Sequence, residues 1–242
     1  MIKFKFSNGK TKKSLSLVCC LFTLVCGGCG AVSRPASLPG LPNPDKTARV
    51  LSKQAQDLNP KVIKLALNAY DKARSEGYDQ KEVLTVIDYS RPSNQRRLWV
   101  FDLRNERLLF NELVSHGRNS GDVVASSFSN QPNSLKTSIG VYATGSTYAG
   151  EHGYSLRLTG LEPGFNNNVY NRAIVMHGAW YVNTQYARQH GAIGRSWGCP
   201  AIDPQVVRPV IDTISHGTVL VAYYPDRAWL NSSSYLRDTR WA

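Results

Sequence analysis

The spacing of hydrophobic residues changes from a helical to a strand-like period near residue 80. Upstream, the weakly amphipathic pattern of residues 47–58 predicts a first helix. Asn59 followed by Pro60 is typical of an N-cap with proline at the first helical position, and it predicts the start of a second helix. Gly77 is expected to end this second helix. We therefore predict a helical appendage over residues 46–78. The apolar positions of the second helix recur every three or four residues: Val62, Leu65, Ala66, Ala69, Tyr70 and Ala73.

Beyond residue 80, short apolar runs alternate with Gly, Pro and Asn, as in strands joined by turns. A turn at Asn105 and Glu106 predicts a hairpin, and residues 204–215 are expected to be helical. The pattern predicts a mainly β fold, a sandwich or a barrel, with flanking helices. This domain is expected to span residues 79–226, with residues 227–242 as a C-terminal tail. The expected strands are residues 83–89, 97–103, 107–115, 138–144, 154–158, 173–177 and 218–224.

The first 30 residues have the layout of an export signal. Residues 1–13 carry five lysines and no acid, and residues 14–25 are apolar but short for a membrane span. Small residues directly before Cys29 resemble a bacterial lipoprotein processing site. Three outcomes stay open: lipidation of Cys29 with membrane anchoring, plain cleavage near residue 31, or retention as an anchor. Residues 31–45 contain four prolines and are predicted to form a tether. The protein is thus expected to be exported, to the periplasm or cell envelope.

The charge of the chain is strongly basic. Removing the five lysines of residues 1–13 from the net charge of +12 leaves +7. A basic surface suits an anionic polymer, such as a cell wall, a membrane face or nucleic acid, although a solvated surface without a partner fits as well. The sequence has no dense Lys/Arg run and no zinc-finger spacing. We therefore expect no nucleic-acid partner, while the oligomeric state is not indicated.

Four of the five cysteines lie in the leader, at positions 19, 20, 26 and 29. Cys199 is the remaining one, so the globular part has no internal disulfide. An unpaired thiol in an oxidising compartment is a liability unless it is shielded or used. Cys199 follows Gly198, which allows close approach of the backbone, and the amides around the thiol could form an oxyanion hole.

A histidine could activate this thiol. His177 follows the apolar run 173–176 and could take the thiol proton and return it to a leaving amine. The pattern alone does not choose among the five histidines at positions 116, 152, 177, 190 and 216. A buried structural cysteine and a structural histidine are the alternative. No histidine pair has the helical spacing of a metalloprotease, and we expect neither a metal nor a cofactor.

Residues 89–225 resemble the murein L,D-transpeptidase catalytic-domain family, bacterial cell-wall enzymes with a cysteine nucleophile. The resemblance runs in order through segments 89–93, 115–121, 127–130, 153–158, 174–179 and 194–201, and the Ser-x-Gly-Cys element after an upstream His-Gly is its most specific part.

The resemblance implies a β-sandwich-like catalytic fold and a role for each site residue. Cys199 would be the acylated nucleophile and His177 its base, and Ser196 would support the turn, its carbonyl orienting the imidazole. The amides of Gly198 and Cys199 would hold the oxyanion. The family reaction opens the bond between the third and fourth residues of a peptidoglycan stem peptide, releases D-alanine, and passes the acyl group to an amine or to water.

Two departures from the broader superfamily concern substrate recognition. Trp197 stands where a histidine is usual, and Ala201 stands where an arginine usually follows the cysteine. Arg195, Arg157 and Tyr154 are the candidates for binding substrate instead. A hydrolase of the same bond, or of a link between wall and lipoprotein, stays open, as does a non-catalytic wall-binding lipoprotein.

Overall fold

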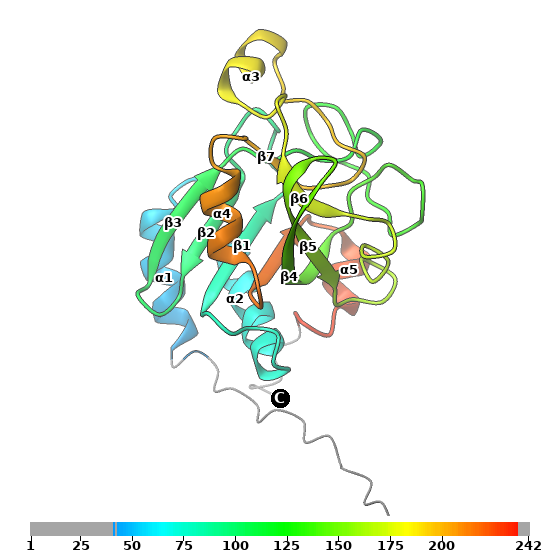
Figure 1. The fold of residues 1–242 in the computed structure, drawn as a ribbon. Helices are drawn as coiled ribbons and strands as arrows, with labels where there is room; N and C mark the ends of the chain where they lie inside the picture. The colour runs from blue at the N-terminus through cyan, green and yellow to red at the C-terminus, as the bar shows by residue number, and fades with distance from the viewer. Residues whose placement is uncertain (1–40, 42, 237–242) are drawn as a thin grey trace, which may run out of the picture. The chain divides into compact units, whose positions relative to one another are not determined.

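A single eight-stranded sheet organises the part of the chain that the structure describes (Figure 1). The computed structural model describes residue 41 and residues 43–236. The predicted signal, its Cys29 and most of the predicted tether lie outside these residues. The strand order is β3-β2-β1-β8-β4-β5-β6-β7. The strands are β1 (Val83–Asp88), β2 (Leu98–Asp102), β3 (Arg107–Glu112), β4 (Gly140–Gly150), β5 (Gly153–Gly160), β6 (Val175–Gly178), β7 (Ala201–Ile202) and β8 (Val219–Tyr223).

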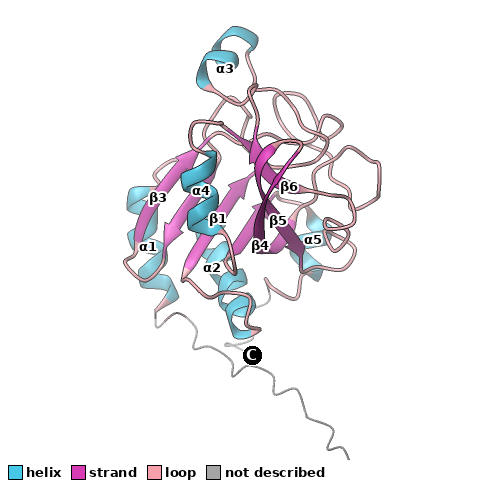
Figure 2. Cartoon of the chain, in the orientation of Figure 1, coloured by secondary structure: helices cyan, strands magenta, loops and turns pink. Residues whose placement is uncertain are grey.

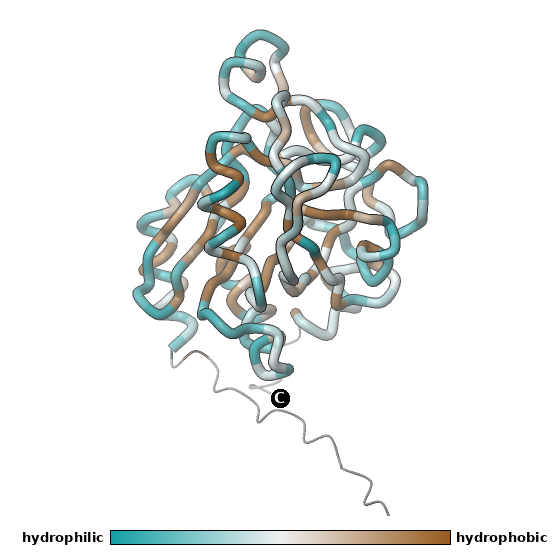
Figure 3. The backbone as a smooth tube through the Cα atoms, in the orientation of Figure 1, coloured by the Kyte–Doolittle hydropathy of each residue, from teal (hydrophilic) through white to brown (hydrophobic). Residues whose placement is uncertain are grey.

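The central strands are covered on both faces, which explains their continuous apolar runs. Every residue of β1 is buried. Successive side chains of a strand point to opposite faces. Leu84 and Val86 accordingly pack into one hydrophobic core, whereas Val83 and Ile87 pack into another on the other face. Figure 3 shows the same distribution, with hydrophobic strands inside and hydrophilic loops outside.

Two N-terminal helices cover one face of the sheet. They are α1 (Pro44–Gln54) and α2 (Pro60–Ser75), and both start in the same way. The side chains of Asn43 and Asn59 each accept a backbone N–H of the first turn, and a proline follows directly. Helix α1 therefore begins inside the segment predicted as tether, and it ends earlier than the predicted residue 58.

Three more helices complete the fold (Figure 2). Helix α4 (Val207–Ile214) buries Val210, Ile211 and Ile214 in the core opposite α1 and α2. Helix α5 (Arg227–Ser232) lies in the predicted tail, and its fully buried Trp229 belongs to the core under α1 and α2. The short helix α3 (Thr184–His190) was not predicted, and it projects beyond β7 at the top of Figure 1.

The predicted fold class, mainly β with flanking helices, is confirmed. The hairpin of β2 and β3 forms as expected, and β7, with two residues, was too short to predict. Within residues 43–236, no helix is long and apolar enough to cross a membrane.

Candidate active site

The Cys199 thiol is enclosed at the last strand of the sheet. Its residue is 8% exposed and unpaired, and it immediately precedes Pro200 and strand β7. The sulfur accepts a weak hydrogen bond from the N–H of Val175, at 3.5 Å, and lies 3.8 Å from the carbonyl oxygen of Ala173. The thiol is thus held against the backbone where β6 begins.

His177 lies on the same strand as the backbone group that contacts the thiol. His177 of β6 pairs in parallel register with Ala201 of β7. Val175 lies two residues before His177, and Cys199 lies two residues before Ala201. Two residues along a strand span about 7 Å. His177 and Cys199, far apart in the sequence, therefore lie on adjoining segments at the edge of the sheet.

The hydrogen bond of His177 defines its tautomer. Its Nδ1 lies 3.0 Å from the carbonyl oxygen of Gly178. A carbonyl only accepts, so Nδ1 carries the proton and Nε2 of the neutral ring is free to accept one. The ring of His152, at the turn between β4 and β5, stacks on His177 with centroids 4.4 Å apart. This stacking leaves His177 only 5% exposed.

Burial disfavours both charged forms of the pair. It raises the pKa of the Cys199 thiol, against smaller lowering effects of the Val175 N–H and of Arg172. Burial also lowers the pKa of His177, the Gly178 carbonyl opposes this, and His152 lowers it further. At neutral pH the resting site therefore holds a thiol and a neutral imidazole.

Two serine hydroxyls fix the backbone of the nucleophile. Ser196 Oγ donates to the carbonyl oxygen of Cys199 at 2.6 Å and accepts the N–H of Gly198 at 3.1 Å. Ser115 Oγ donates to the same carbonyl at 3.3 Å. Among residues 43–236, the Cys199 N–H has no hydrogen-bond partner. The Cys199 amide is therefore the free donor for an oxyanion, whereas that of Gly198 is engaged.

The backbone groups of Ser196 pair with residues 116 and 118. Its carbonyl oxygen accepts the N–H of Arg118 at 2.8 Å, and the N–H of Ser196 donates to the His116 carbonyl at 3.0 Å. The imidazole of His177 is oriented by Gly178. Ser196 thus supports the turn, as the resemblance implies, but through its hydroxyl and its backbone pairing with residues 116–118.

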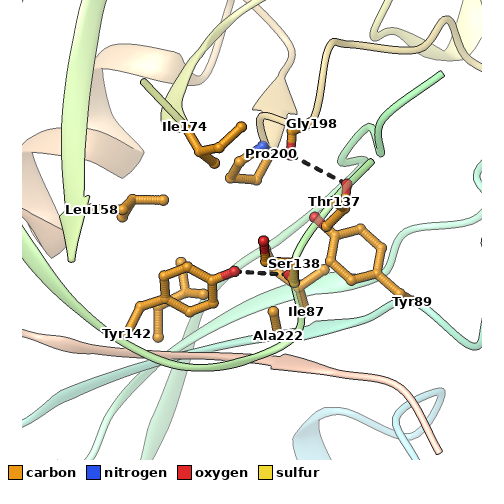
Figure 4. A pocket seen from close by; sticks show the side chains of 11 residues that line it. Ile87, Tyr89, Thr137, Ser138, Tyr142, Leu158, Ile174, Gly198, Pro200 and Ala222 are labelled. Atoms are coloured by element: carbon orange, nitrogen blue, oxygen red, sulfur yellow. Dashed lines mark hydrogen bonds between the residues drawn. The ribbon is translucent and has the colours of Figure 1, made fainter. Parts of the chain in front are cut away.

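Gly198 is required by its surroundings. Its φ is +127°, and a Cβ there would lie 2.7 Å from Ile174 Cδ1 and 2.8 Å from the Lys136 carbonyl oxygen. Thr137 Oγ1 also donates to its carbonyl, at 3.2 Å (Figure 4). The cavity behind this turn measures about 10 Å³ and is lined by side chains such as Ile174 and Tyr142, so it holds at most about one water. The cavity is therefore too small to hold a peptide.

The three candidate binding residues have other partners. Arg195 pairs with Asp122 at 3.3 Å and lines an open hollow of about 380 Å³ beside α3. The guanidinium of Arg157 lies 4.4 Å from the ring centroid of Tyr148, and the hydroxyl of Tyr154 donates to Asp212 of α4. Their role in substrate binding stays a prediction. Within residues 43–236, no group of His, Cys, Asp or Glu could ligate a metal.

The family is decided by a sequence model that covers most of the chain. The model of the L,D-transpeptidase catalytic domain matches residues 54–223. The chain belongs to this family. No curated protein matches the chain in sequence.

Solved L,D-transpeptidases also resemble the structure. One from Mycobacterium smegmatis is 16% identical over 59% of each chain, with a TM-score of 0.37. One from Stackebrandtia nassauensis is 15% identical over 73% of this chain and 76% of that one, with a TM-score of 0.34. The aligned part thus spans 59% of the Mycobacterium smegmatis protein.

The two departures of this L,D-transpeptidase domain from the usual motif lie in different surroundings. Trp197 is 72% exposed and lines the hollow with Arg195, so it lies on the surface beside the nucleophile turn. Ala201 is fully buried and pairs with β6. The position that usually carries an arginine is therefore enclosed here and holds a small side chain.

Two supporting groups of this domain were missed from the sequence. Buried Arg97 donates to the Val114 carbonyl and to Nδ1 of His116, which holds the segment paired with the nucleophile turn. Arg172 donates to four acceptors of residues 129–138, next to Gly198. Neither arginine belongs to a local motif, since each acts through residues distant in the sequence.

Proposed function

We propose that this chain is an exported cysteine acyl-transferase of the L,D-transpeptidase type, acting on peptidoglycan stem peptides. The observation that carries the proposal is the enclosed, unpaired thiol of Cys199 on the segment adjoining the strand of His177. A merely structural cysteine would not require a neighbouring imidazole whose Nε2 is free to accept a proton.

The first half-reaction forms a thioester. Nε2 of His177 takes the thiol proton, and the thiolate attacks the carbonyl carbon of the third stem residue. The Cys199 N–H stabilises the oxyanion of the tetrahedral intermediate. The C–N bond to the fourth residue then breaks, and the leaving amine of D-alanine takes the proton from His177.

The second half-reaction transfers the acyl group. An acceptor amine attacks the thioester carbonyl and gives a proton to His177, which returns it to the departing sulfur of Cys199. An amide is formed and the free thiol is restored. If water replaces the amine, the same steps release a carboxylic acid, so the acceptor decides between transfer and hydrolysis.

Export and anchoring are part of the proposal because of the first 30 residues. The lysine-rich start, the apolar run and the small residues before Cys29 support export, with lipidation as one possible outcome. The net charge of +7 beyond the leader suits the anionic cell envelope.

Product analysis tests this function. The purified protein is incubated with disaccharide tetrapeptides, with and without an added amine, and the products are identified by chromatography and mass spectrometry. We expect a cross-linked or amine-exchanged product from the wild type and none from Cys199→Ser. A tripeptide as the sole product would identify the hydrolase. Wall binding without turnover of any donor would favour the non-catalytic wall-binding protein.

A further inference from the structure

Arg172 brings a positive charge next to the nucleophile turn. Its Nη2 is 3.5 Å from the position that a Cβ on Gly198 would occupy, and Gly198 directly precedes Cys199. On the other side, Ala173 directly follows Arg172, and its carbonyl oxygen lies 3.8 Å from the Cys199 sulfur. The guanidinium thus lies beside Gly198, the residue before the nucleophile, and the backbone that follows Arg172 contacts the sulfur.

Neutral groups satisfy the hydrogen bonds of this guanidinium but leave its charge uncompensated. Nη1 donates to the Ser129 carbonyl and to Ser138 Oγ, both at 2.7 Å. Nη2 donates to Ser134 Oγ at 3.1 Å and to the Lys136 carbonyl at 2.6 Å. Within residues 43–236, none of its hydrogen-bond partners is a carboxylate. An anion formed at Cys199 would therefore meet a fixed and unpaired cation.

The other groups that sense the charge of Cys199 are uncharged at neutral pH. Tyr89 and Tyr181 are the tyrosines concerned, and burial raises the pKa of both. His177 is neutral because burial lowers its pKa. Arg172 is the group that lowers the pKa of Cys199 after the Val175 N–H. Burial lowers the pKa of Arg172, and Tyr142 and Cys199 oppose this shift.

We propose that Arg172 is the charge-compensating residue of this active site, stabilising the Cys199 thiolate in the place of the arginine that follows the cysteine in related enzymes. The inference rests on the proposed function, in which Cys199 is the nucleophile. It also assigns residues 129–138 a purpose, since their carbonyls and hydroxyls orient the guanidinium beside the turn.

The pH dependence of thiol alkylation measures this effect directly. Iodoacetamide reacts with the thiolate, forming the S–C bond and releasing iodide, and the rate constant against pH gives the pKa of Cys199. Serine replaces the leader cysteines 19, 20, 26 and 29, so that Cys199 is the reactive thiol. Loss of a nearby opposite charge shifts a pKa by about one unit or more. For Arg172→Gln we expect about tenfold slower alkylation at neutral pH and an unchanged limiting rate at high pH, while Arg172→Lys recovers at least part of the loss.

A matched pair at Ser134 keeps the test decisive even if Arg172→Gln fails to fold. Ser134→Asp places a carboxylate against Nη2 of Arg172, so the pKa of Cys199 should rise, whereas Ser134→Asn should leave it unchanged. Equal shifts in the two Ser134 variants would overturn the inference, as would a folded Arg172→Gln protein with the wild-type pH profile. Muropeptides that fail to acylate a protein showing the expected alkylation pattern would count against the proposed function alone.

Discussion

The buried imidazole of His116 should make the free energy of unfolding of this domain decrease as the pH falls. His116 is fully buried, and its Nδ1 lies 2.8 Å from Nη2 of Arg97. A guanidinium only donates, so Nδ1 is the unprotonated acceptor and Nε2–H donates to the Gly121 carbonyl at 3.3 Å. Protonation would set two donors against each other beside a buried cation.

The magnitude follows from the pKa difference between the folded and the unfolded chain. Burial first, and then Arg97, lowers the pKa of His116 to about 4, against 6.5 for an ordinary histidine. Between these values the unfolded chain binds a proton that the folded chain does not. The stabilisation is therefore complete above pH 6.5 and is lost as the pH falls toward 4. At 1.36 kcal/mol per unit, His116 costs the folded state about 3 kcal/mol at pH 4.

Urea unfolding at pH 7 and pH 4 isolates this contribution. His116→Asn keeps an acceptor for Arg97 near the position of Nδ1 but cannot titrate. The wild type should lose about 3 kcal/mol more than this variant between the two pH values. His190→Asn, at an exposed position of α3, serves as the control and should behave like the wild type. Equal losses in the wild type and in His116→Asn would refute the neutral, buried imidazole.

Three further results are expected. His152→Ala removes the ring that stacks on His177 and that lowers the pKa of His177. The acid limb of the pH profile for acylation by muropeptide should therefore move to higher pH, and an unchanged pH profile would contradict the role of the stacking. Ser196→Ala removes a hydrogen-bond partner of the Gly198 N–H and of the Cys199 carbonyl, and should lower the free energy of unfolding by about 1–3 kcal/mol in thermal or urea unfolding. A Ser196→Ala protein as stable as the wild type would show that this hydroxyl is dispensable. Cys29→Ser should release the protein from membranes in cell fractionation. Unchanged membrane association would refute the lipid anchor on Cys29 but not the proposed export.

The fold was predictable where one local pattern dominates. The alternation of short apolar runs and turns placed seven of the eight strands, and Asn59 before Pro60 placed the start of α2. The equivalent Asn43 before Pro44 lies in a proline-rich stretch, where the composition hid the cap. Helix α3 buries a single residue, Ala187, so it has no apolar periodicity to recognise.

The residues of the candidate site also differ in how far the sequence alone indicates them. Cys199 and His177 stand in short motifs with recognisable chemistry, and both lie where the sheet brings neighbouring segments together, although their roles stay predictions. Arg172 and Arg97 have no such motif, because their effects depend on carbonyls and rings supplied by distant segments. Arg195 lies in the same loop as Cys199 and pairs with Asp122, and its role in binding substrate stays a prediction.

The most direct test of the central claim is the intact mass of the protein after brief incubation with a tetrapeptide muropeptide at neutral pH. The account predicts an added mass equal to the donor minus D-alanine, located on Cys199 by peptide mapping and absent from Cys199→Ser. An adduct on another residue, or wall-modifying activity that survives Cys199→Ser, would contradict it.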